Sequence, residues 1–187
     1  MAITSDRLLL RNWLESDLEP FARLNADPSV MEFLPGVLSR AESDQLAARM
    51  SQHASRNGFG LCAAELRASH TFIGFIALSI PSFTAPFTPC VEIGWRLAHA
   101  HWGQGLATEG ARALVQHAFG DLALPALVSF TVPQNLRSRR IMEKLGMTYD
   151  PADDFDHPNL AEGHPLRRHV LDRLQRTQWD SSEGGKL

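Results

Sequence analysis

Two glycines flank a glutamine in the stretch HAHWGQGLATEG, which runs from His99 to Gly110. A strand-like aliphatic run precedes this stretch, and an amphipathic helical pattern follows it. A helix that begins just after glycines offers unbonded backbone N–H groups and a partial positive charge, and both attract anions. Gly103 and Gly105 therefore predict a phosphate-binding turn. The alternative is a tight turn that needs only a positive φ at each glycine.

Two familiar phosphate motifs do not fit this stretch. A P-loop requires G-x-x-x-x-G-K-[ST], and the two lysines of the chain, Lys144 and Lys186, are not near it. A dinucleotide fingerprint requires a third glycine early in a βαβ unit. Here Thr108 replaces that glycine, and several antiparallel-looking strands come first. A nucleotide-binding protein that uses the turn for ATP is therefore disfavoured.

Hydrophobic spacing predicts the elements that must position this turn. Capping boxes are expected at Ser16–Glu19 and Ser39–Glu42, and Gly58 is expected to end the second helix. Asn135 is the expected N-cap of the last helix, and capping would leave its other amide atoms free. Helices are predicted at 16–27, 39–57, 107–118 and 135–145, and strands at 3–13, 59–66, 71–80, 90–97, 125–132, 147–150 and 166–174.

Composition excludes several classes of protein. Hydrophobic residues make up 44% of the 187 residues and charged residues 21%, which is typical of a globular chain rather than a disordered one. The net charge is −3 and the chain has no long basic tract, so it lacks the positively charged surface expected of a general nucleic-acid binder. No apolar run approaches the roughly 18 residues of a membrane span, and the first residues lack a signal-peptide layout. A cytoplasmic protein without a membrane or nucleic-acid partner is expected.

The length predicts a single domain over 1–179, with 180–187 as a flexible tail. Cys62 and Cys90 lack CxxC spacing and are expected as small buried residues rather than disulfide or zinc partners. His157 and His164 lie among aspartates in the Pro-rich stretch 151–165, but their spacing fits no standard metal pattern. No metal site is expected.

Three sequence blocks resemble the GNAT N-acetyltransferases. Their pyrophosphate loop has the pattern [RQ]-x-x-G-x-[GA], which aligns with residues 102–107, although Trp102 stands where Arg or Gln is usual. WGQGLATE, EIGWRL and NLRSRRIMEKLGM are similar to the ribosomal-protein N-acetyltransferase branch (RimJ/RimL type). The order of the predicted elements extends the resemblance to roughly residues 3–173.

The resemblance implies an α/β (α+β) GNAT fold. Its mixed, mostly antiparallel sheet of about six or seven strands is splayed between strands four and five, with helices on both faces. Acetyl-CoA, the implied acetyl donor, sits in that splay. The implied cofactor-binding residues are the backbone amides of Gly103, Gln104, Gly105, Leu106, Ala107 and Thr108 for the pyrophosphate, Trp102 in the same loop, the backbone of Trp95 and Leu97 for pantetheine, and Asn135 for the cofactor arm.

The implied chemistry is attack of an amine on a thioester. Glu92 shares a strand face with Gly94 and Arg96, so space in front of it could admit substrate, and it is the expected general base, acting through water. An ordinary exposed carboxylate or a partner for Arg96 is the alternative. Ser138 is the expected hydrogen-bond donor to the departing thiolate, because Tyr149, the only tyrosine, follows the helix.

The resemblance implies an acceptor that is a primary amine, either a protein N-terminus or a small molecule. Transfer would be direct, in a ternary complex, and stretch 151–165 is expected on the acceptor side. A homodimer is compatible with the resemblance. The rival hypothesis is a non-catalytic acyl-CoA-binding or regulatory protein on the same fold.

Overall fold

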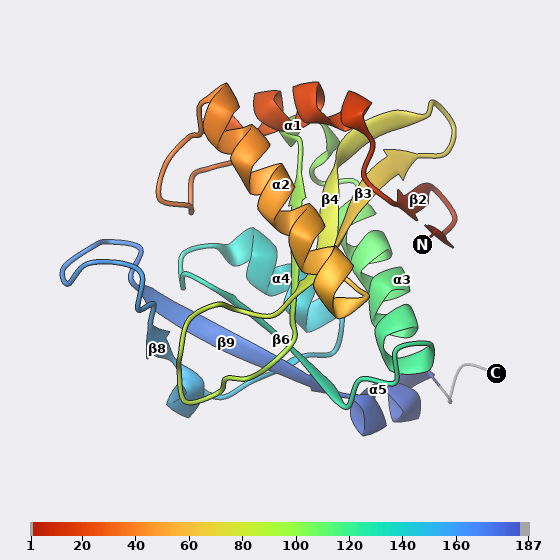
Figure 1. Ribbon diagram of the computed structural model, residues 1–187. Helices are drawn as coiled ribbons and strands as arrows, with labels where there is room; N and C mark the ends of the chain where they lie inside the picture. The colour runs from red at the N-terminus through yellow and green to blue at the C-terminus, as the bar shows by residue number, and fades with distance from the viewer. Residues whose placement is uncertain (1, 184–187) are drawn as a thin grey trace. The chain divides into compact units, whose positions relative to one another are not determined.

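The computed structural model describes residues 2–183, which divide into two compact units. Unit 1 contains the chain up to Ser79 together with Gly94–Leu114. Unit 2 contains Ile80–Ile93 and the chain from Val115 onward. Each unit is described by itself (Figure 1). The single domain expected over 1–179 stays a prediction.

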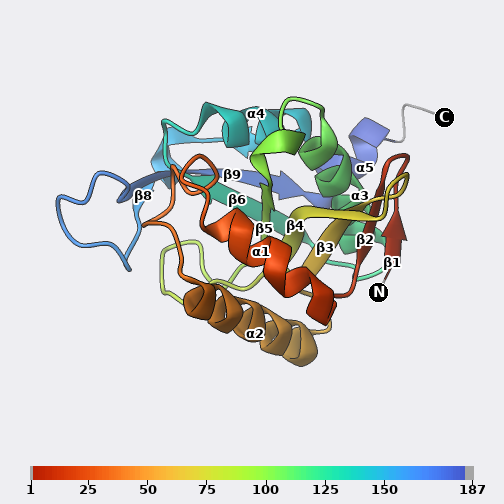
Figure 2. The same ribbon diagram turned by 90° about the horizontal axis from the view of Figure 1, so that it is seen from above.

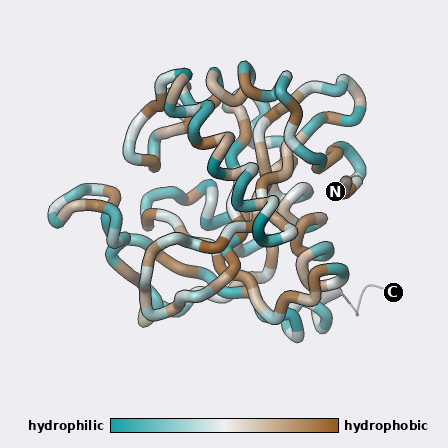
Figure 3. The backbone as a smooth tube through the Cα atoms, in the orientation of Figure 1, coloured by the Kyte–Doolittle hydropathy of each residue, from teal (hydrophilic) through white to brown (hydrophobic). Residues whose placement is uncertain are grey.

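Unit 1 is built on antiparallel strands, namely β1 (Ala2–Thr4), β2 (Leu8–Arg11), β3 (Leu61–Leu66) and β4 (Thr71–Ser79), paired in that order. β4 is followed in the sheet by β5 (Glu92–Leu97), whose residues from Gly94 belong to this unit. Six consecutive residues of β4 are buried, which confirms its predicted place inside the sheet and matches its hydrophobic colouring in Figure 3. The single strand predicted over 3–13 is wrong, because a turn in which Ser5 bonds Leu8 O divides it.

Helices cover both faces of the unit 1 strands, as predicted (Figure 2). On one face lie α1 (Leu18–Asn25) and α2 (Arg40–Asn57), and their apolar side chains pack with Phe75 of β4. On the other face, α3 (Leu106–Gly120) begins, and its Gly110 lies against Ile76 of β4. Alternate β4 side chains therefore face opposite helical layers, as the two-residue period of a strand requires.

The helix caps of unit 1 follow the sequence prediction in part. The Ser39–Glu42 capping box is present, with the Ser39 N–H donating to Glu42 over 2.8 Å, and Gly58 ends α2 at φ 75°. The box predicted at Ser16–Glu19 is wrong. Asp17 is the N-cap of α1 after a short 3-10 turn, η1 (Glu15–Asp17), and its carboxylate is already bonded to Arg11 and the Leu14 N–H.

Unit 2 contains a second group of strands. Glu92, at the start of β5, pairs in parallel with Val128 of β6 (Ala126–Thr131). β6 is antiparallel to β9 (Arg168–Gln175), which also pairs with two short strands, β7 (Thr148–Tyr149) and β8 (Phe155–Asp156). The strand predictions over 125–132, 147–150 and 166–174 are confirmed.

Two helices complete unit 2. α4 (Leu136–Lys144) has Asn135 as its N-cap, as predicted, and the chain leaves it through Gly146 at φ 78°. α5 (Arg176–Glu183) includes residues 180–183, where the sequence pattern predicted the start of a flexible tail. The rest of that predicted tail, 184–187, lies outside the described residues. None of the helices within residues 2–183 has the length and apolarity needed to cross a bilayer.

The mixed, mostly antiparallel sheet with helices is confirmed. Residues 2–183 form nine strands, more than the six or seven predicted, because the first predicted strand is a hairpin and the 151–165 stretch contains β8. Strands four and five of the prediction correspond to β5 and β6. The splay predicted between them stays a prediction.

Candidate functional site

The glycine-containing turn of unit 1 connects β5 to α3. A short 3-10 turn, η2 (His99–His101), leads to Trp102, and Gly103 and Gly105 follow with φ values of 71° and 79°. A Cβ added to Gly103 would meet no atom within 4 Å, and one added to Gly105 would meet the Arg7 guanidinium at 3.6 Å. Glycine is therefore favoured at both positions by the positive φ of the backbone, and not because a side chain would collide with a neighbour. The same open space lets a ligand approach the main chain.

A row of backbone donors lines this turn. Glu109 is the first residue of α3 whose N–H reaches back to the turn, donating to Gly105 O over 3.0 Å. The N–H groups of residues 103–108 have no acceptor within residues 2–183. Helix starts always leave such donors unbonded, and in this protein the row extends back through both glycines. The turn can therefore donate several hydrogen bonds to one anion at the positive end of α3.

Side chains of the turn hold its shape. The Trp102 indole N–H donates to Leu97 O over 2.7 Å, and the ring meets His99 edge-on at 4.8 Å. Gln104 donates from its side chain to Ala100 O over 3.1 Å. The Trp102 and Gln104 side chains thus brace the turn. The cofactor contacts predicted for Trp102 and for the backbone amide of Gln104 stay predictions. A carbonyl oxygen has two lone pairs, so Leu97 O keeps one for the predicted pantetheine contact.

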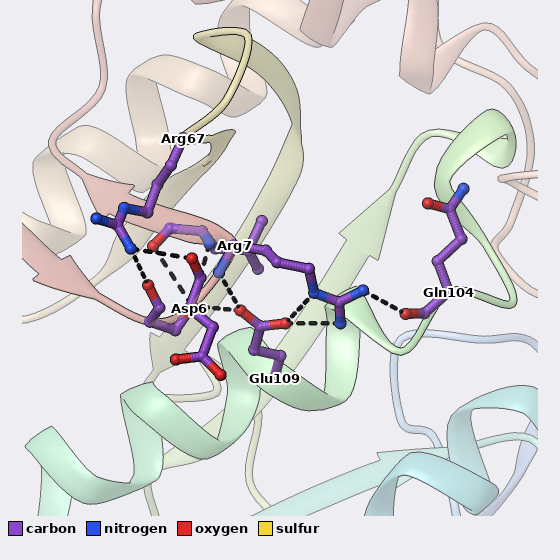
Figure 4. A network of polar contacts seen from close by, with 7 residues as sticks. Asp6, Arg7, Arg67, Gln104 and Glu109 are labelled. Carbon is purple, nitrogen blue, oxygen red and sulfur yellow. Dashed lines mark hydrogen bonds and ion pairs between the residues drawn. The ribbon is translucent and has the colours of Figure 1, made fainter.

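An ion pair ties the start of the chain to this turn (Figure 4). Arg7 donates its main-chain N–H and its Nε to Glu109 of α3, over 2.7 Å each, and its Nη1 to Gln104 O over 2.9 Å. The Ser5 hydroxyl donates to the same carboxylate over 2.7 Å. Arg7 and Ser5 escaped the sequence prediction, because residues 7 and 109 are 102 positions apart and no local pattern links them.

Glu109 brings a negative charge into the first turn of α3. Burial raises the pKa of its carboxyl, but hydrogen bonds from Arg7 and Ser5 lower that pKa to below the ordinary value. The carboxylate therefore stays ionised, and the Arg7 guanidinium neutralises it. An anion at residues 103–108 consequently meets donors rather than an uncompensated negative charge.

Glu92, the predicted base, is half-buried at the start of β5 in unit 2. Cys90, two residues earlier, is half-buried rather than buried as predicted, and it packs against the buried cluster of Val128, Phe155 and Leu171. Burial and then the Glu92 charge raise the pKa of the Cys90 thiol, and burial raises that of Cys62 to about 12. Neither cysteine forms a disulfide. Arg96, considered as a partner for Glu92, donates to Asn25 instead.

Asn135 and Ser138 lie at the start of α4 in unit 2. Asn135 Oδ1 accepts the Ser138 N–H over 3.2 Å, and its Nδ2 donates to Thr131 Oγ1 over 3.0 Å. The amide was expected to be free apart from capping, so the Thr131 bond corrects that expectation and leaves one N–H for a ligand. The half-buried Ser138 hydroxyl has no hydrogen-bond partner within residues 2–183. Tyr149 lies beyond the helix on β7, as predicted.

The 151–165 stretch of unit 2 contains a short 3-10 turn, η3 (Pro151–Asp153), and β8. Its His157 ring lies 4.7 Å from Phe83 and 5.1 Å from His169, and burial lowers the pKa of both histidines. Aromatic packing therefore positions this stretch. Within residues 2–183, no three His, Cys, Asp or Glu side chains gather as a metal site would need.

The predicted site residues fall into two groups. Unit 1 contains Trp95, Leu97 and the whole 102–108 turn, while unit 2 contains Glu92, Asn135 and Ser138. Within unit 1 the Trp102 indole joins the turn to Leu97, and within unit 2 Asn135 is bonded to Ser138. The assembly of the two groups into one site stays a prediction.

Comparison with known proteins gives consistent matches. A model of the acetyltransferase (GNAT) domain matches residues 7–148. FsC-acetyl coenzyme A-N(2)-transacetylase of Aspergillus fumigatus is 31% identical over 168 residues, covering 84% of this chain and 68% of that protein. The crystal structure of an acetyltransferase from Agrobacterium tumefaciens has a TM-score of 0.75 and 27% identity over 94% of each chain. A ribosomal-protein-S5-alanine acetyltransferase from Vibrio fischeri has a TM-score of 0.74 at 14% identity, covering 96% and 98% of the two chains, and shows the fold alone.

Proposed function

The chain belongs to the GNAT acetyltransferase family, and from that premise we propose that it transfers the acetyl group of acetyl-CoA to a primary amine. Transfer is direct, within a complex of enzyme, acetyl-CoA and amine. The amine is a protein N-terminus or a small molecule, and its chemistry is developed further below. The WGQGLATE stretch supports a place near the RimJ/RimL type. A cytoplasmic location belongs to the proposal, and a homodimer is compatible with it.

The row of unbonded N–H groups at residues 103–108 carries this proposal. Gly103 and Gly105 have positive φ values, their donors lead into those of the first turn of α3, and no atom lies within 4 Å of a Cβ added to Gly103. Such an array suits a pyrophosphate, which offers several anionic oxygens at once. Gln104 O and Glu109, which would repel that anion, are both bonded to Arg7.

In the proposed reaction, the amine nitrogen forms a bond to the thioester carbonyl carbon, and the carbon–sulfur bond then breaks. Glu92 takes the amine proton through an ordered water, because a carboxylate with a pKa near ~4.3 is a weak base for direct abstraction. Ser138 donates a hydrogen bond to the departing CoA thiolate. Its hydroxyl stabilises the charge without giving up its proton. A backbone N–H of β5 would stabilise the tetrahedral oxyanion.

The experiment that tests the cofactor site uses two glycines in matched conformations. Gly103→Val and Gly58→Val place the same side chain at φ 71° and φ 75°, in each case with no neighbour within 4 Å. Both substitutions strain the backbone alike, so only a loss specific to Gly103 reports on the ligand. We expect Gly103→Val to weaken acetyl-CoA binding by about tenfold or more in calorimetry, while Gly58→Val binds as the wild type does. Equal binding by both variants would contradict the assignment.

Thiol-release kinetics with peptides, polyamines, amino acids and aminoglycosides test the chemistry. We expect Glu92→Gln to lower kcat by about 10²-fold or more, and Ser138→Ala by about tenfold, with acetyl-CoA affinity retained. Acetyl-CoA binding without turnover of any amine would favour the rival hypothesis, a non-catalytic acyl-CoA-binding protein. Stabilisation by ATP rather than acetyl-CoA would overturn the proposal.

A further inference from the structure

A cavity of about 390 Å³ lies within unit 1, beside β5. The segment between α1 and α2 forms one wall, the first half of α2 another, and Arg96 of β5 lies at its side. Most of its lining is apolar, contributed by Met31, Leu34, Pro35, Val37, Leu38 and Leu46. The charged residues of the lining are Glu42, Arg49 and Arg96. A cavity with a mostly apolar lining and a few charged groups is typical of a small-molecule binding site.

The Arg96 side chain is half-buried, and the two partners of its guanidinium carry no charge. It donates to Asn25 Oδ1 over 2.6 Å and lies over the Phe75 ring at 5.4 Å, and both partners are neutral. No carboxylate of unit 1 pairs with it. Burial lowers the pKa of Arg96 to about 10, so the side chain remains charged near neutral pH. Buried charges are ordinarily paired, and one that lines a cavity can be paired by a ligand.

The groups behind Arg96 fix its orientation. Asn25 and Ser43 are both completely buried, and Asn25 Nδ2 donates to Ser43 Oγ over 2.9 Å. That bond orients the amide so that its oxygen faces Arg96. Asn25 uses one of the five N–H groups of the guanidinium. The arrangement therefore holds the cation in place and leaves several donors for another acceptor.

The acidic residue of the lining does not offset this charge. Glu42 accepts from the Ser39 N–H and hydroxyl, over 2.8 and 2.7 Å, as part of the capping box at the start of α2. Those bonds lower the pKa of the Glu42 carboxyl, so its charge is committed to the helix terminus. Arg49, the other cation, is exposed. The lining therefore carries one more positive than negative charge.

We propose that this cavity takes the carboxylate end of the acceptor, which makes the acceptor an amine that carries a carboxylate and an apolar side chain, as an apolar amino acid does. Arg96 pairs with the carboxylate through two parallel hydrogen bonds, and the apolar lining takes the side chain. Gly94, on the same strand face as Arg96, has no side chain to block the amine end. This inference rests on the proposed function, since it names the amine of that reaction.

The test compares two ligands that differ in one charge. N-acetyl-L-leucine and N-acetyl-L-leucinamide both lack an ammonium group, and only the first carries a carboxylate. We titrate each into the full chain saturated with CoA and expect the acid to bind about 10- to 100-fold more tightly, as a charge-assisted pair predicts. Equal binding, or no detectable binding of the acid, would overturn the inference.

Substitutions assign that preference to Arg96. Arg96→Met removes the charge and keeps the length, so the ratio of the two affinities should fall to about one. Arg96→Lys keeps the charge without the planar fork and should give an intermediate ratio. The matched control is Arg56→Met, which removes an exposed arginine elsewhere on α2 and should leave the ratio unchanged. A preference that survives Arg96→Met would overturn the assignment even if acetyl transfer is intact.

Kinetics separate this inference from the proposed function. L-Leucine and L-leucinamide serve as acceptors in the thiol-release assay. Turnover of both at equal kcat/KM overturns the inference and leaves the proposed function standing. Binding of N-acetyl-L-leucine through Arg96 without turnover of any amine supports the anion site and overturns the proposed function.

Discussion

Two arginines of unit 1 show opposite ways to bury a guanidinium. Arg11 on β2 lies 2.6 Å from Asp17 and 2.6 Å from Glu65, both buried carboxylates. Arg96 on β5 has a neutral amide at the same 2.6 Å distance and an aromatic ring instead. The partners of Arg11 raise its pKa, whereas burial lowers that of Arg96. Protein carboxylates neutralise the charge of Arg11. Arg96 has no such partner in unit 1, so its N–H donors can still pair with a ligand.

The difference between the two arginines is one of role: Arg11 supports the fold, and Arg96 is proposed to bind a ligand. Arg11 joins β2, β3 and the start of α1, so its charge is consumed in holding elements together. Arg96 is held by Asn25 and Ser43, which fix its position without neutralising it. A half-buried cation without a protein anion does little for stability, which fits the ligand-binding role proposed for Arg96. Three changes test the comparison.

The largest effect is expected from Arg11→Met. This variant leaves the Asp17 and Glu65 carboxylates buried without their cation, which costs about 3–5 kcal/mol in the free energy of unfolding. Arg96→Met loses one hydrogen bond, worth about 1 kcal/mol, but also removes a cation that has no anion, so its net cost is at most about 1 kcal/mol. Denaturant unfolding of both variants measures the two costs. Equal costs would show that the two arginines have the same structural role.

A smaller effect is expected from acid. Hydrogen bonds from Arg11 and then His70 lower the pKa of the Glu65 carboxyl from 4.5. Folding therefore favours the ionised form, and the resulting stability is present above about pH 4.5 and is lost as the pH falls through the lower folded value. Thermal unfolding at several pH values should show the wild type losing its advantage over Glu65→Gln on acidification. Arg96→Met, which alters no carboxylate pair within unit 1, should follow the wild-type trend; divergence would contradict the comparison.

The smallest change in stability is expected from Asn25→Asp, which gives Arg96 an isosteric carboxylate partner. The free energy of unfolding should stay within about 1 kcal/mol of the wild type, because Ser43 can donate to the new carboxylate. The affinity for N-acetyl-L-leucine should nevertheless fall by about tenfold. Calorimetry measures that loss, with Asn57→Asp at the exposed end of α2 as the matched control. Unchanged affinity would mean that the charge of Arg96 is not what the cavity offers.

Local patterns predicted the fold well. The Ser39–Glu42 box, Gly58 after α2, and Asn135 before α4 all depend on residues within four positions of one another. Such signals are complete in the sequence itself. The Ser16–Glu19 box had the same local form, yet Asp17 between them serves Arg11 and Leu14 instead. A tertiary contact overrode that local preference.

In the candidate site, the part formed by the backbone was predictable from the sequence. Gly103 and Gly105 indicated the turn because glycine is the residue that most readily adopts a positive φ. Arg7 gave no signal, and Arg96 was considered only as a partner for Glu92, because their actual partners lie 102 and 71 positions away in the sequence. Trp102 departed from the family pattern for a reason visible only in three dimensions, the bond from its indole to Leu97 O. Long-range pairing, rather than propensity, limits what the sequence reveals.

The Arg7–Glu109 pair also sets an order of events during synthesis. Arg7 leaves the ribosome 102 residues before Glu109, an interval of about 5–20 s at ordinary rates of translation. The 103–108 turn can form its glycine conformations as soon as it emerges, because those are local. The residue that braces it, Arg7, was made 102 residues before Glu109, with which it pairs. The turn is thus completed by a residue made 102 positions earlier, and its final shape dates from the moment Arg7 and Glu109 meet.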